Sequence, residues 1–454
     1  MSYQDEYKTK LTTAEAVAAT VQSGDLLKFG YFNGKPVMLT DALGKRHAEL
    51  RDVTIISVAT MPPIPMEVLQ HKESFTWWDW HWSKATRLLK DHFESIIYAP
   101  VMYHSCEDFL RQGQVHKGQV PAWSWQQVGP MDEHGYFNFG PNNSESFEAN
   151  MFSAKVCVEV NKHMPRCLGG SKEGIHISQV DAIVEAPDDQ VIFAAPEFPA
   201  PAENEIKIAE NLIPFMRNGS CIQLGIGGLP NALGQVIKKT DLKDLGIHSE
   251  MFVDPFVDMI DSGQINGLKK NIDVGKAVYT FGIGTQRMYD WMHNNPRISS
   301  NSVGYVNDPR VICRNDNFVS INQALQVDMF TNVSAESHGT RHITGCGGMM
   351  DFTLGAQWSK GGQSFICFPA TYTDKEGNLQ SNVVGYFEYG TNVTVNRHMV
   401  DYIVTEYGVR KMKAQNIWVR AENMIELAHP QFRDWLIEEA NKLKIWTRTN
   451  KQHQ

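Results

Sequence analysis

A helix, a short strand, a glycine-containing loop and a second helix are predicted twice in this chain of 454 residues, about 195 residues apart. The pattern runs from Ala16 to Leu43 and again from Ile208 to Leu233. Each copy has a glycine at the end of its first helix, another that opens the loop, and a proline near the start of its second helix. The repetition predicts two related α/β halves, and chance similarity of two common strand-to-helix turns is the alternative.

The residues from Ala195 to Glu205, APEFPAPAENE, are dense in proline and alanine, which is typical of a domain boundary. We therefore predict an N-terminal α/β domain over residues 1–194, a linker over residues 195–205 and a C-terminal α/β domain over residues 206–454.

Apolar β-branched runs alternate with helical stretches in both halves, a pattern typical of open, largely parallel sheets. Ligands bind such sheets beyond the carboxyl ends of the strands, so the loops at that edge are expected to form the site. A capping box at Thr12 and Glu15 is expected to start the first helix. Strands are predicted over residues 52–58, 181–185, 190–193, 303–305 and 402–405, and a helix over residues 430–443.

Charge and composition exclude several classes of partner. The 42 basic and 51 acidic residues give a net charge of −9 without a block of like charge, so the chain lacks the basic footprint of a nucleic-acid-binding protein. The first fifteen residues lack the apolar core of a signal peptide, and no stretch approaches the roughly 18 apolar residues of a membrane span. Seven cysteines without a CxxC pair favour a reducing compartment. We expect a soluble cytoplasmic protein that binds neither nucleic acid nor membrane.

The segment from Gln223 to Asn231, QLGIGGLPN, is the first candidate site. An apolar strand leads into three glycines within four residues, and a proline follows at a predicted helix start. Glycines allow a ligand to approach the backbone, and the helix N-terminus offers free N–H groups to an anion. The segment is neither a Walker A loop nor a GxGxxG fingerprint, so a purely conformational need for glycine is the alternative.

The segment from Leu245 to Asp254 follows about twenty residues later and is predicted as the neighbouring buried strand, with Glu250 inside its apolar run. A carboxylate in such a strand is costly to desolvate unless it is hydrogen-bonded. Glu250 is therefore either a strand-end residue that reaches solvent or a nucleophile or base beside the glycine loop.

A second glycine-rich segment, from Ser337 to Ala356, is the third candidate site. The Gly347-Gly348 step can expose two backbone N–H groups as an oxyanion hole. Cys346 is the alternative nucleophile, but no neighbouring residue is an evident base for it. The sixteen histidines form no HExxH motif and no paired Cys/His spacing, so we predict no metal site.

Four of the eleven tryptophans gather between Phe75 and Trp82. Such a cluster is typical of core or subunit-interface packing, and an acceptor pocket for an apolar acid is the alternative.

Several of these motifs, taken in order along nearly the whole chain, resemble one family. It is the class I acyl-CoA:carboxylate CoA-transferases of the 4-hydroxybutyrate and butyryl-CoA:acetate type, also grouped with acetyl-CoA hydrolases. The motifs that carry the resemblance are Gly225–Leu229, His248–Phe252, Val160–Arg166, Ile175–Glu185, Tyr305–Pro309, Asn315–Asn322, Gly345–Phe352 and Val404–Gly408.

The resemblance implies two similar open α/β domains of the NagB/RpiA/CoA-transferase-like type, with the active site between them. It implies that Glu250 is the nucleophile of a ping-pong reaction, through an acyl-glutamyl anhydride and a glutamyl-CoA thioester. CoA is then a substrate, short-chain acyl-CoA and small carboxylic acids are the other ligands, no cofactor is permanently bound, and a homodimer or higher homo-oligomer is expected. The residues expected at the thioester are Gly347 and Gly348, and those expected at CoA are Gly225, Ile226, Gly227, Gly228, Leu229, Gly345 and Gln363.

The chain departs from the family pattern at a few positions. Met349 stands where glutamine is common, Gln363 where lysine is frequent, and Asp254-Pro255 where Asp-Gly is usual. Loss of the lysine removes a positive charge that would suit a CoA phosphate. The loop at Tyr31 and the tryptophan cluster also differ, so the acid substrate can be bulkier than acetate or butyrate.

Other functions remain open at this stage. An acyl-CoA hydrolase on the same scaffold would let water reach the anhydride. A non-catalytic CoA- or nucleotide-binding regulator could share the fold, although the intact Glu250 argues against it. A zinc or cysteine hydrolase is the most distant alternative.

Overall fold

The computed structural model describes residues 2–197, 199–225 and 227–446. The chain forms two compact units. The first unit combines residues 1–196 with residues 277–306, and the second combines residues 197–276 with residues 307–454.

The first unit is built on a seven-stranded sheet with the order β4-β3-β2-β1-β5-β7-β9, in which every pair of neighbours is parallel. Most of these strands are buried along their whole length, as expected for a parallel sheet covered on both faces. The strands are β1 Leu26–Phe29, β2 Val53–Ser57, β3 Phe75–Asp79, β4 Ile96–Tyr98, β5 Trp123–Val128, β7 Val156–Val160 and β9 Ala182–Glu185.

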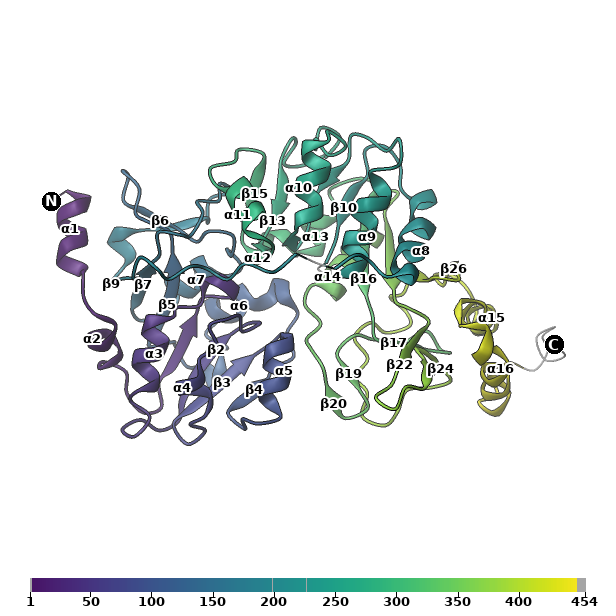
Figure 1. The fold of residues 1–454 in the computed structure, drawn as a ribbon, viewed down its shortest axis with the longest axis horizontal. Coiled ribbons are helices and arrows are strands. Elements are labelled where there is room, and N and C mark those ends of the chain that lie inside the picture. Colours follow the sequence, from purple (N-terminus) through teal and green to yellow (C-terminus); the bar gives the residue numbers. More distant parts are fainter. Residues whose placement is uncertain (1, 198, 226, 447–454) are drawn as a thin grey trace. The chain divides into compact units, whose positions relative to one another are not determined.

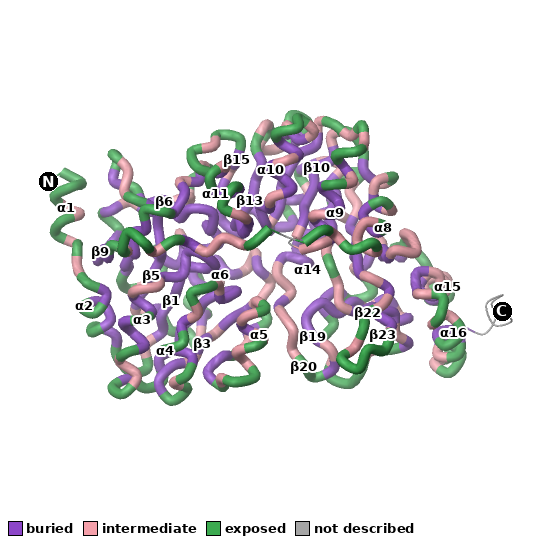
Figure 2. Tube along the Cα trace, in the orientation of Figure 1, coloured by how far each residue is buried: buried purple, intermediate pink, exposed green. Residues whose placement is uncertain are grey.

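Helices and short turns surround this sheet (Figure 1). The helices are α1 Tyr3–Lys10, α2 Ala14–Ala18, α3 Met38–Gly44, α4 Met66–Leu69, α5 Lys84–Lys90, α6 Cys106–Arg111 and α7 Ser146–Met151. A separate two-stranded antiparallel sheet pairs β6 Tyr136–Asn138 with β8 Gly174–His176. Short 3-10 turns lie at Phe32–Gly34, Tyr103–Ser105, His116–Gly118 and Ile177–Gln179. Apolar residues of α2, α3 and α4 pack with β1, β2 and β3 in one core, whereas α1 buries no residue (Figure 2).

Residues 277–306 return to the first unit after the chain has entered the second. They contain β13 Ala277–Tyr279, β14 Phe281–Gly282, α11 Gln286–Met292, β15 Ile298–Ser300 and α12 Val303–Val306. The predicted domain limits place this segment in the C-terminal domain. It packs with the first unit because the Phe281 ring stacks on Phe32 with centroids 4.0 Å apart, and Ser300 pairs with Gly169. The domain limits 1–194, 195–205 and 206–454 stay a prediction.

The second unit is built on a six-stranded sheet with the order β11-β10-β16-β21-β25-β26, parallel except for the last pair. Its strands are β10 Cys221–Gln223, β11 Gly246–Ile247, β16 Phe318–Gln323, β21 Gln363–Cys367, β25 Tyr402–Thr405 and β26 Gly408–Lys411. Its helices are α8 Glu203–Leu212, α9 Gly228–Ile237, α10 Asp254–Asp261, α13 Pro309–Ile312, α14 Met349–Trp358, α15 Ile417–Leu427 and α16 Arg433–Lys442.

Shorter strands complete the second unit, and 3-10 turns lie at Ile213–Phe215 and Pro430–Phe432. The strands are β12 Met251–Phe252, β17 Gln326–Asp328, β18 Val333–Ser334, β19 Ser337–His338, β20 Arg341–His342, β22 Thr371–Thr373, β23 Leu379–Ser381 and β24 Val383–Val384. Apolar residues of β17, β18, β24, α15 and α16 share one core cluster. With a largely parallel open sheet in each unit, the structure confirms the predicted α/β class.

The repeated pattern is present in both units. It comprises α2, β1, Gly30 and α3 in the first unit, and α8, β10, Gly225 and α9 in the second. Both prolines lie near a helix start as predicted, since α3 begins two residues after Pro36 and α9 begins two residues before Pro230. The predicted cap is shifted, because the Thr13 hydroxyl rather than that of Thr12 accepts the backbone N–H of Ala16.

Most predicted strands are confirmed, but two are wrong. Residues 190–193 form no strand, because the backbone N–H groups of Gln190 and Val191 donate locally, to the carbonyls of Pro187 and Asp189. Residues 303–305 belong to α12, where the carbonyl of Ser302 accepts the N–H groups of Tyr305 and Val306.

Candidate active site

Two loops leave the carboxyl edge of the sheet in the second unit. Gly225 follows β10 and Glu250 follows β11, and the parallel register of these neighbours aligns Ile222 with Ile247. The Ser249 hydroxyl donates to the Leu224 carbonyl at 3.1 Å and accepts the Leu224 N–H at 3.3 Å. The glycine loop and Glu250 are therefore held side by side, at the edge where parallel sheets bind ligands.

Glu250 lies in a break between β11 and β12. The predicted continuous buried strand is wrong at this point, because Ser249 bonds to Leu224 and the chain leaves the ladder. Glu250 is partly exposed. A carboxyl group in a strand interruption can face a ligand, whereas one in a continuous buried strand would face the core.

The Glu250 carboxyl group receives two hydrogen bonds. Asn307 Nδ2 donates to Glu250 Oε2 at 2.6 Å, and the backbone N–H of Gly348 donates to the same group. Burial raises the pKa of Glu250 from 4.5 to about 8, against the lowering effect of the Asn307 hydrogen bond. The negative charge of Asp351 raises that pKa further, and the Gly348 hydrogen bond lowers it. A carboxylate of such raised basicity is a stronger nucleophile than an ordinary one.

Gly348 is matched to this contact because it lacks a side chain. A Cβ at Gly348 would overlap Glu250 Oε2 and Asn307 Nδ2. The preceding Gly347 has φ +51°, in the left-handed region that glycine adopts without strain, and Gly348 is the N-cap of α14. Gly345 is buried in the same loop. The loop thus directs the Gly348 N–H at the Glu250 carboxyl group.

The glycine loop after β10 has one open side. A Cβ at Gly225 would meet no atom within 4 Å, whereas one at Gly228 would overlap the Glu205 carboxylate. Gly227 has φ +125° and caps α9, and Leu229 is buried in that helix. Ile226, also predicted at CoA, lies outside the described residues. The carboxylate beside Gly228 disfavours an anion there, whereas the side of the loop at Gly225 is open.

The Cys346 thiol lies in the loop before α14. Burial raises the pKa of this thiol well above its usual value, and Glu336 adds to the effect. A neutral buried thiol is a poor nucleophile, so the geometry favours Glu250 over Cys346.

Comparison with known proteins places the chain in a family. Residues 1–195 match the acetyl-CoA hydrolase/transferase N-terminal domain, and residues 284–440 match the acetyl-CoA hydrolase/transferase C-terminal domain. The chain is 43% identical over 455 residues to the butyryl-CoA:acetate CoA-transferase of Anaerostipes caccae. The matched region covers 99% of this chain and 100% of that protein. The chain belongs to the acetyl-CoA hydrolase/transferase family.

Two further comparisons agree with membership of this acetyl-CoA hydrolase/transferase family. A probable butyrate:acetyl-CoA coenzyme A-transferase of Syntrophomonas wolfei is 41% identical over 449 residues, which is 98% of each chain. The crystal structure of RipA from Yersinia pestis superimposes with a TM-score of 0.89 at 33% identity, over 98% of this chain and all of that one. The predicted family resemblance is thereby confirmed.

Gln363 is not brought to Glu250 in this family member. It is the first residue of β21, at the amino end of the parallel strands, whereas Gly225 and Glu250 follow carboxyl ends. Its side-chain amide donates to the Tyr402 hydroxyl at 3.3 Å. Its predicted contact with CoA stays a prediction without support from this placement.

Three residues of the acetyl-CoA hydrolase/transferase site were not singled out from the sequence. Ser249 joins the two loops, Asn307 holds Glu250, and Asp351 lies 3.3 Å from Asn307 through its Oδ2 atom. Asn307 and Asp351 lie inside quoted motifs, but only folding brings them together. A buried polar residue next to a predicted nucleophile has no sequence signal of its own.

The tryptophan cluster contributes to the core of the first unit. Trp77 and Trp82 belong to the cluster that fills the space between the sheet and its helices, and Trp77 Nε1 donates to the Thr60 hydroxyl at 2.9 Å. Tyr31 is also buried, and Lys28 Nζ lies 3.7 Å from the centre of its ring. Packing accounts for these side chains, and an acceptor pocket at Tyr31 stays a prediction.

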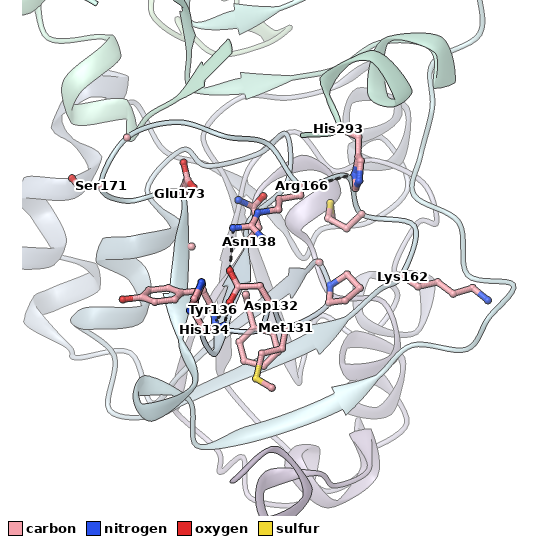
Figure 3. Close-up of a pocket in the computed structure, with 16 residues that line it drawn as sticks. Met131, Asp132, His134, Tyr136, Asn138, Lys162, Arg166, Ser171, Glu173 and His293 are labelled. Carbon is pink, nitrogen blue, oxygen red and sulfur yellow. Dashed lines mark hydrogen bonds and ion pairs between the residues drawn. The ribbon is translucent and has the colours of Figure 1, made fainter. Parts of the chain in front are cut away.

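A cavity of about 620 Å³ lies in the first unit, beside the β6–β8 strand pair (Figure 3). Arg166 and Asp132 point toward each other there and form an ion pair at 3.0 Å, while the Arg166 N–H donates to His293 Nδ1 at 3.1 Å. Lys162 reaches Asp188 at 2.7 Å. The charged groups largely pair with one another, and none of the predicted site residues lines this cavity.

In the part of the chain that the structure describes, no three histidine, cysteine, aspartate or glutamate side chains gather as metal ligands. Within the same residues, no helix has the length and apolar character needed to cross a membrane.

Proposed function

We propose that this protein transfers CoA from a short-chain acyl-CoA, with acetyl-CoA as the expected donor, to a free carboxylic acid by a ping-pong reaction on Glu250. One observation carries the proposal. A partly exposed carboxyl group with a pKa raised to about 8 is held by Asn307 and Gly348 next to an open glycine loop. Relatives named as CoA-transferases over their whole length support the reaction class.

The first half-reaction begins with the Glu250 carboxylate. One of its oxygens attacks the thioester carbonyl carbon, the C–S bond breaks, and its electron pair leaves on the CoA sulfur. The product is an acyl-glutamyl anhydride and a CoA thiolate. The thiolate then attacks the glutamyl carbonyl carbon and expels the first acid as a carboxylate, which leaves Glu250 as a CoA thioester.

The second half-reaction runs through the same steps in reverse with a different acid. The acceptor carboxylate attacks the glutamyl carbonyl carbon and expels the CoA thiolate, which forms a second anhydride. The thiolate attacks the acyl carbonyl of that anhydride, and Glu250 leaves as a carboxylate. No water is consumed, so the thioester bond energy is retained.

Backbone N–H groups have the role of stabilising negative charge in these steps. The Gly348 N–H already donates to the Glu250 carboxyl group. We assign it, with the N–H of Gly347, to the oxyanion that forms when either carbonyl is attacked. CoA lies along the open side of the loop at Gly225, where its remote contacts contribute the binding energy that a strained anhydride requires.

Isotope exchange tests this proposal. Incubation with acetyl-CoA and labelled acetate, in the absence of another acid, moves the label into acetyl-CoA because the first half-reaction is reversible. Glu250→Gln abolishes the exchange, and Asp328→Asn, which changes a buried carboxylate elsewhere in the second unit, retains it. Full exchange in Glu250→Gln would refute the proposal.

Acyl-CoA hydrolysis on the same residue is the second candidate, and the partial exposure of Glu250 favours it, since water has a route to the anhydride. Steady release of free CoA without any acceptor acid, at the rate seen with acid present, would identify a hydrolase. The substrate pair, a cytoplasmic location and a homo-oligomeric state stay predictions.

A further inference from the structure

We propose that Asp351 is a positioning residue that acts on Glu250 through Asn307, by orienting the nucleophile and by favouring its conversion into an uncharged covalent intermediate. The inference rests on the proposed function and extends it to a residue with no previous role.

The geometry joins two carboxyl groups through one amide. Asn307 and Asp351 are both fully buried, and Asn307 Nδ2 lies 2.6 Å from Glu250 Oε2 and 3.3 Å from Asp351 Oδ2. A side-chain amide nitrogen carries two hydrogens, so it can donate to both groups at once. The shorter hydrogen bond fixes the Glu250 carboxyl group, and the longer one, to Asp351, fixes the orientation of the Asn307 amide.

Asp351 decides which way the Asn307 amide points. The Oδ1 atom of Asn307 is buried and has no hydrogen-bond partner among the described residues. No hydrogen-bond donor among the described residues therefore holds the oxygen end of the Asn307 amide. A flipped amide would place its oxygen against two carboxyl groups, which is unfavourable. With Asp351 present, the NH2 end of Asn307 therefore faces both Glu250 and Asp351.

Asp351 also places a negative charge beside the nucleophile. It lies in the first turn of α14, whose N-terminus stabilises negative charge. Two neighbouring buried charges repel, and the repulsion ends when Glu250 becomes an anhydride or thioester, since neither is charged. The charge at Asp351 therefore raises the energy of the free carboxylate relative to that of the covalent enzyme.

The other titratable groups around Glu250 do not replace Asp351. The Cys346 thiol, in the loop before α14, is kept neutral because burial, and after it the charge of Glu336, raise its pKa. Glu336 itself accepts a hydrogen bond from the Thr394 hydroxyl at 2.8 Å. Asp351 is thus the carboxyl group whose charge acts on Glu250 directly.

The test compares wild type with Asp351→Asn, which keeps the size of the side chain and removes its charge. Each protein is mixed with acetyl-CoA over a range of pH and quenched in acid, and the covalent CoA adduct is measured by intact mass. We expect the pH of half-maximal adduct formation to fall by about one unit, since a single neighbouring charge is removed. At a fixed ratio of acetyl-CoA to acetate, the equilibrium fraction of adduct should fall severalfold.

Asp328→Asn is the matched control, because Asp328 is a buried carboxyl group of the same unit that holds Asn332 rather than Asn307. Its pH midpoint and adduct fraction should equal those of wild type. If Asp351→Asn does not fold, Asp351→Ser, which is smaller and also uncharged, must show the same downward shift.

The outcomes separate this inference from the proposed function. Absence of an adduct in wild type contradicts the proposed function itself. A wild-type adduct with an unchanged pH midpoint and fraction in the folded Asp351 variant overturns only the role of Asp351.

Discussion

The chemistry of the site depends on the partial burial of Glu250. Burial raises its pKa to about 8, although Asn307 and Gly348 both donate hydrogen bonds to it. At neutral pH only about a tenth of the molecules then carry the reactive anion. That anion is more basic, and hence more nucleophilic, than an ordinary glutamate. A smaller fraction of the molecules is ionised, but each ionised carboxylate reacts faster.

The rate of adduct formation should therefore depend on pH. Only the carboxylate attacks a thioester, so the single-turnover rate should rise about tenfold per unit up to about pH 8 and level off above it. Rapid quenching with acetyl-CoA between pH 5.5 and 9 measures the profile. A rate that is flat between pH 6 and pH 8 would mean that Glu250 has the pKa of an ordinary glutamate.

The same raised pKa predicts a stability change. The folded protein keeps the Glu250 proton up to about pH 8, whereas the unfolded chain releases it near 4.5, so stability falls as pH rises between these values. Glu250→Gln removes this penalty, and its Tm at pH 8 should exceed that of wild type by a few degrees, with no difference at pH 4.5. Scanning calorimetry at both pH values checks this. Equal melting temperatures at pH 8 would show that Glu250 is not desolvated.

At the scale of elements, the site is made by loops that follow adjacent parallel strands. β10 and β11 place the glycine loop and Glu250 at one edge, and the turn into α14 brings Gly348 and Asp351 to the same carboxyl group. The glycine loop and the turn into α14 also bring backbone close to Glu250. Glycines at these turns therefore respond to substitution according to what lies opposite their missing Cβ.

Two glycines of the first loop should behave differently. Gly225→Ala meets no atom within 4 Å, so it should keep the Tm of wild type and raise the KM for acyl-CoA severalfold by blocking the approach of CoA. Gly228→Ala would displace the Glu205 carboxylate, which accepts the Ala202 N–H at 2.8 Å at the start of α8, so it should lower the Tm as well. Initial rates and thermal unfolding of both variants measure the contrast. An unchanged KM in Gly225→Ala would place CoA elsewhere.

At the scale of the whole molecule, the chain enters the second unit and returns to the first before it ends. Residues 277–306 complete the first unit through the Phe281–Phe32 stack and the pairing of Gly169 with Ser300. A sequence cut at the proline-rich segment after residue 194 therefore omits part of the packing of the first unit.

A fragment of residues 1–196 should consequently fold poorly. It lacks the partner of Phe32, and loss of a buried aromatic contact of this kind costs about 3 kcal/mol or more. We expect weak near-ultraviolet circular dichroism and binding of a hydrophobic dye. The same fragment joined to residues 277–306 should recover a cooperative transition. A cooperative transition in the short fragment would show that residues 277–306 are dispensable.

Local patterns in the sequence predicted much of this architecture. The repeat, β2, β9 and β25 follow from apolar periodicity, and the proximity of Gly225 and Glu250 follows from the order of parallel strands. Contacts that depend on tertiary folding could not be read in this way. Asn307 follows residues 303–305, which the sequence predicts as a strand although they are helical. Asp351 lies in the first turn of α14, where acidic residues are common, so its sequence position does not indicate a role in the site.

The central claim is that Glu250 carries CoA covalently. Wild-type protein incubated with acetyl-CoA alone, quenched in acid and digested, should yield the peptide containing Glu250 with the added mass of CoA, and later addition of an acid should remove it. The Glu250→Gln protein should yield no such peptide. An unmodified peptide in wild type, with full transferase activity in Glu250→Gln, would contradict the claim.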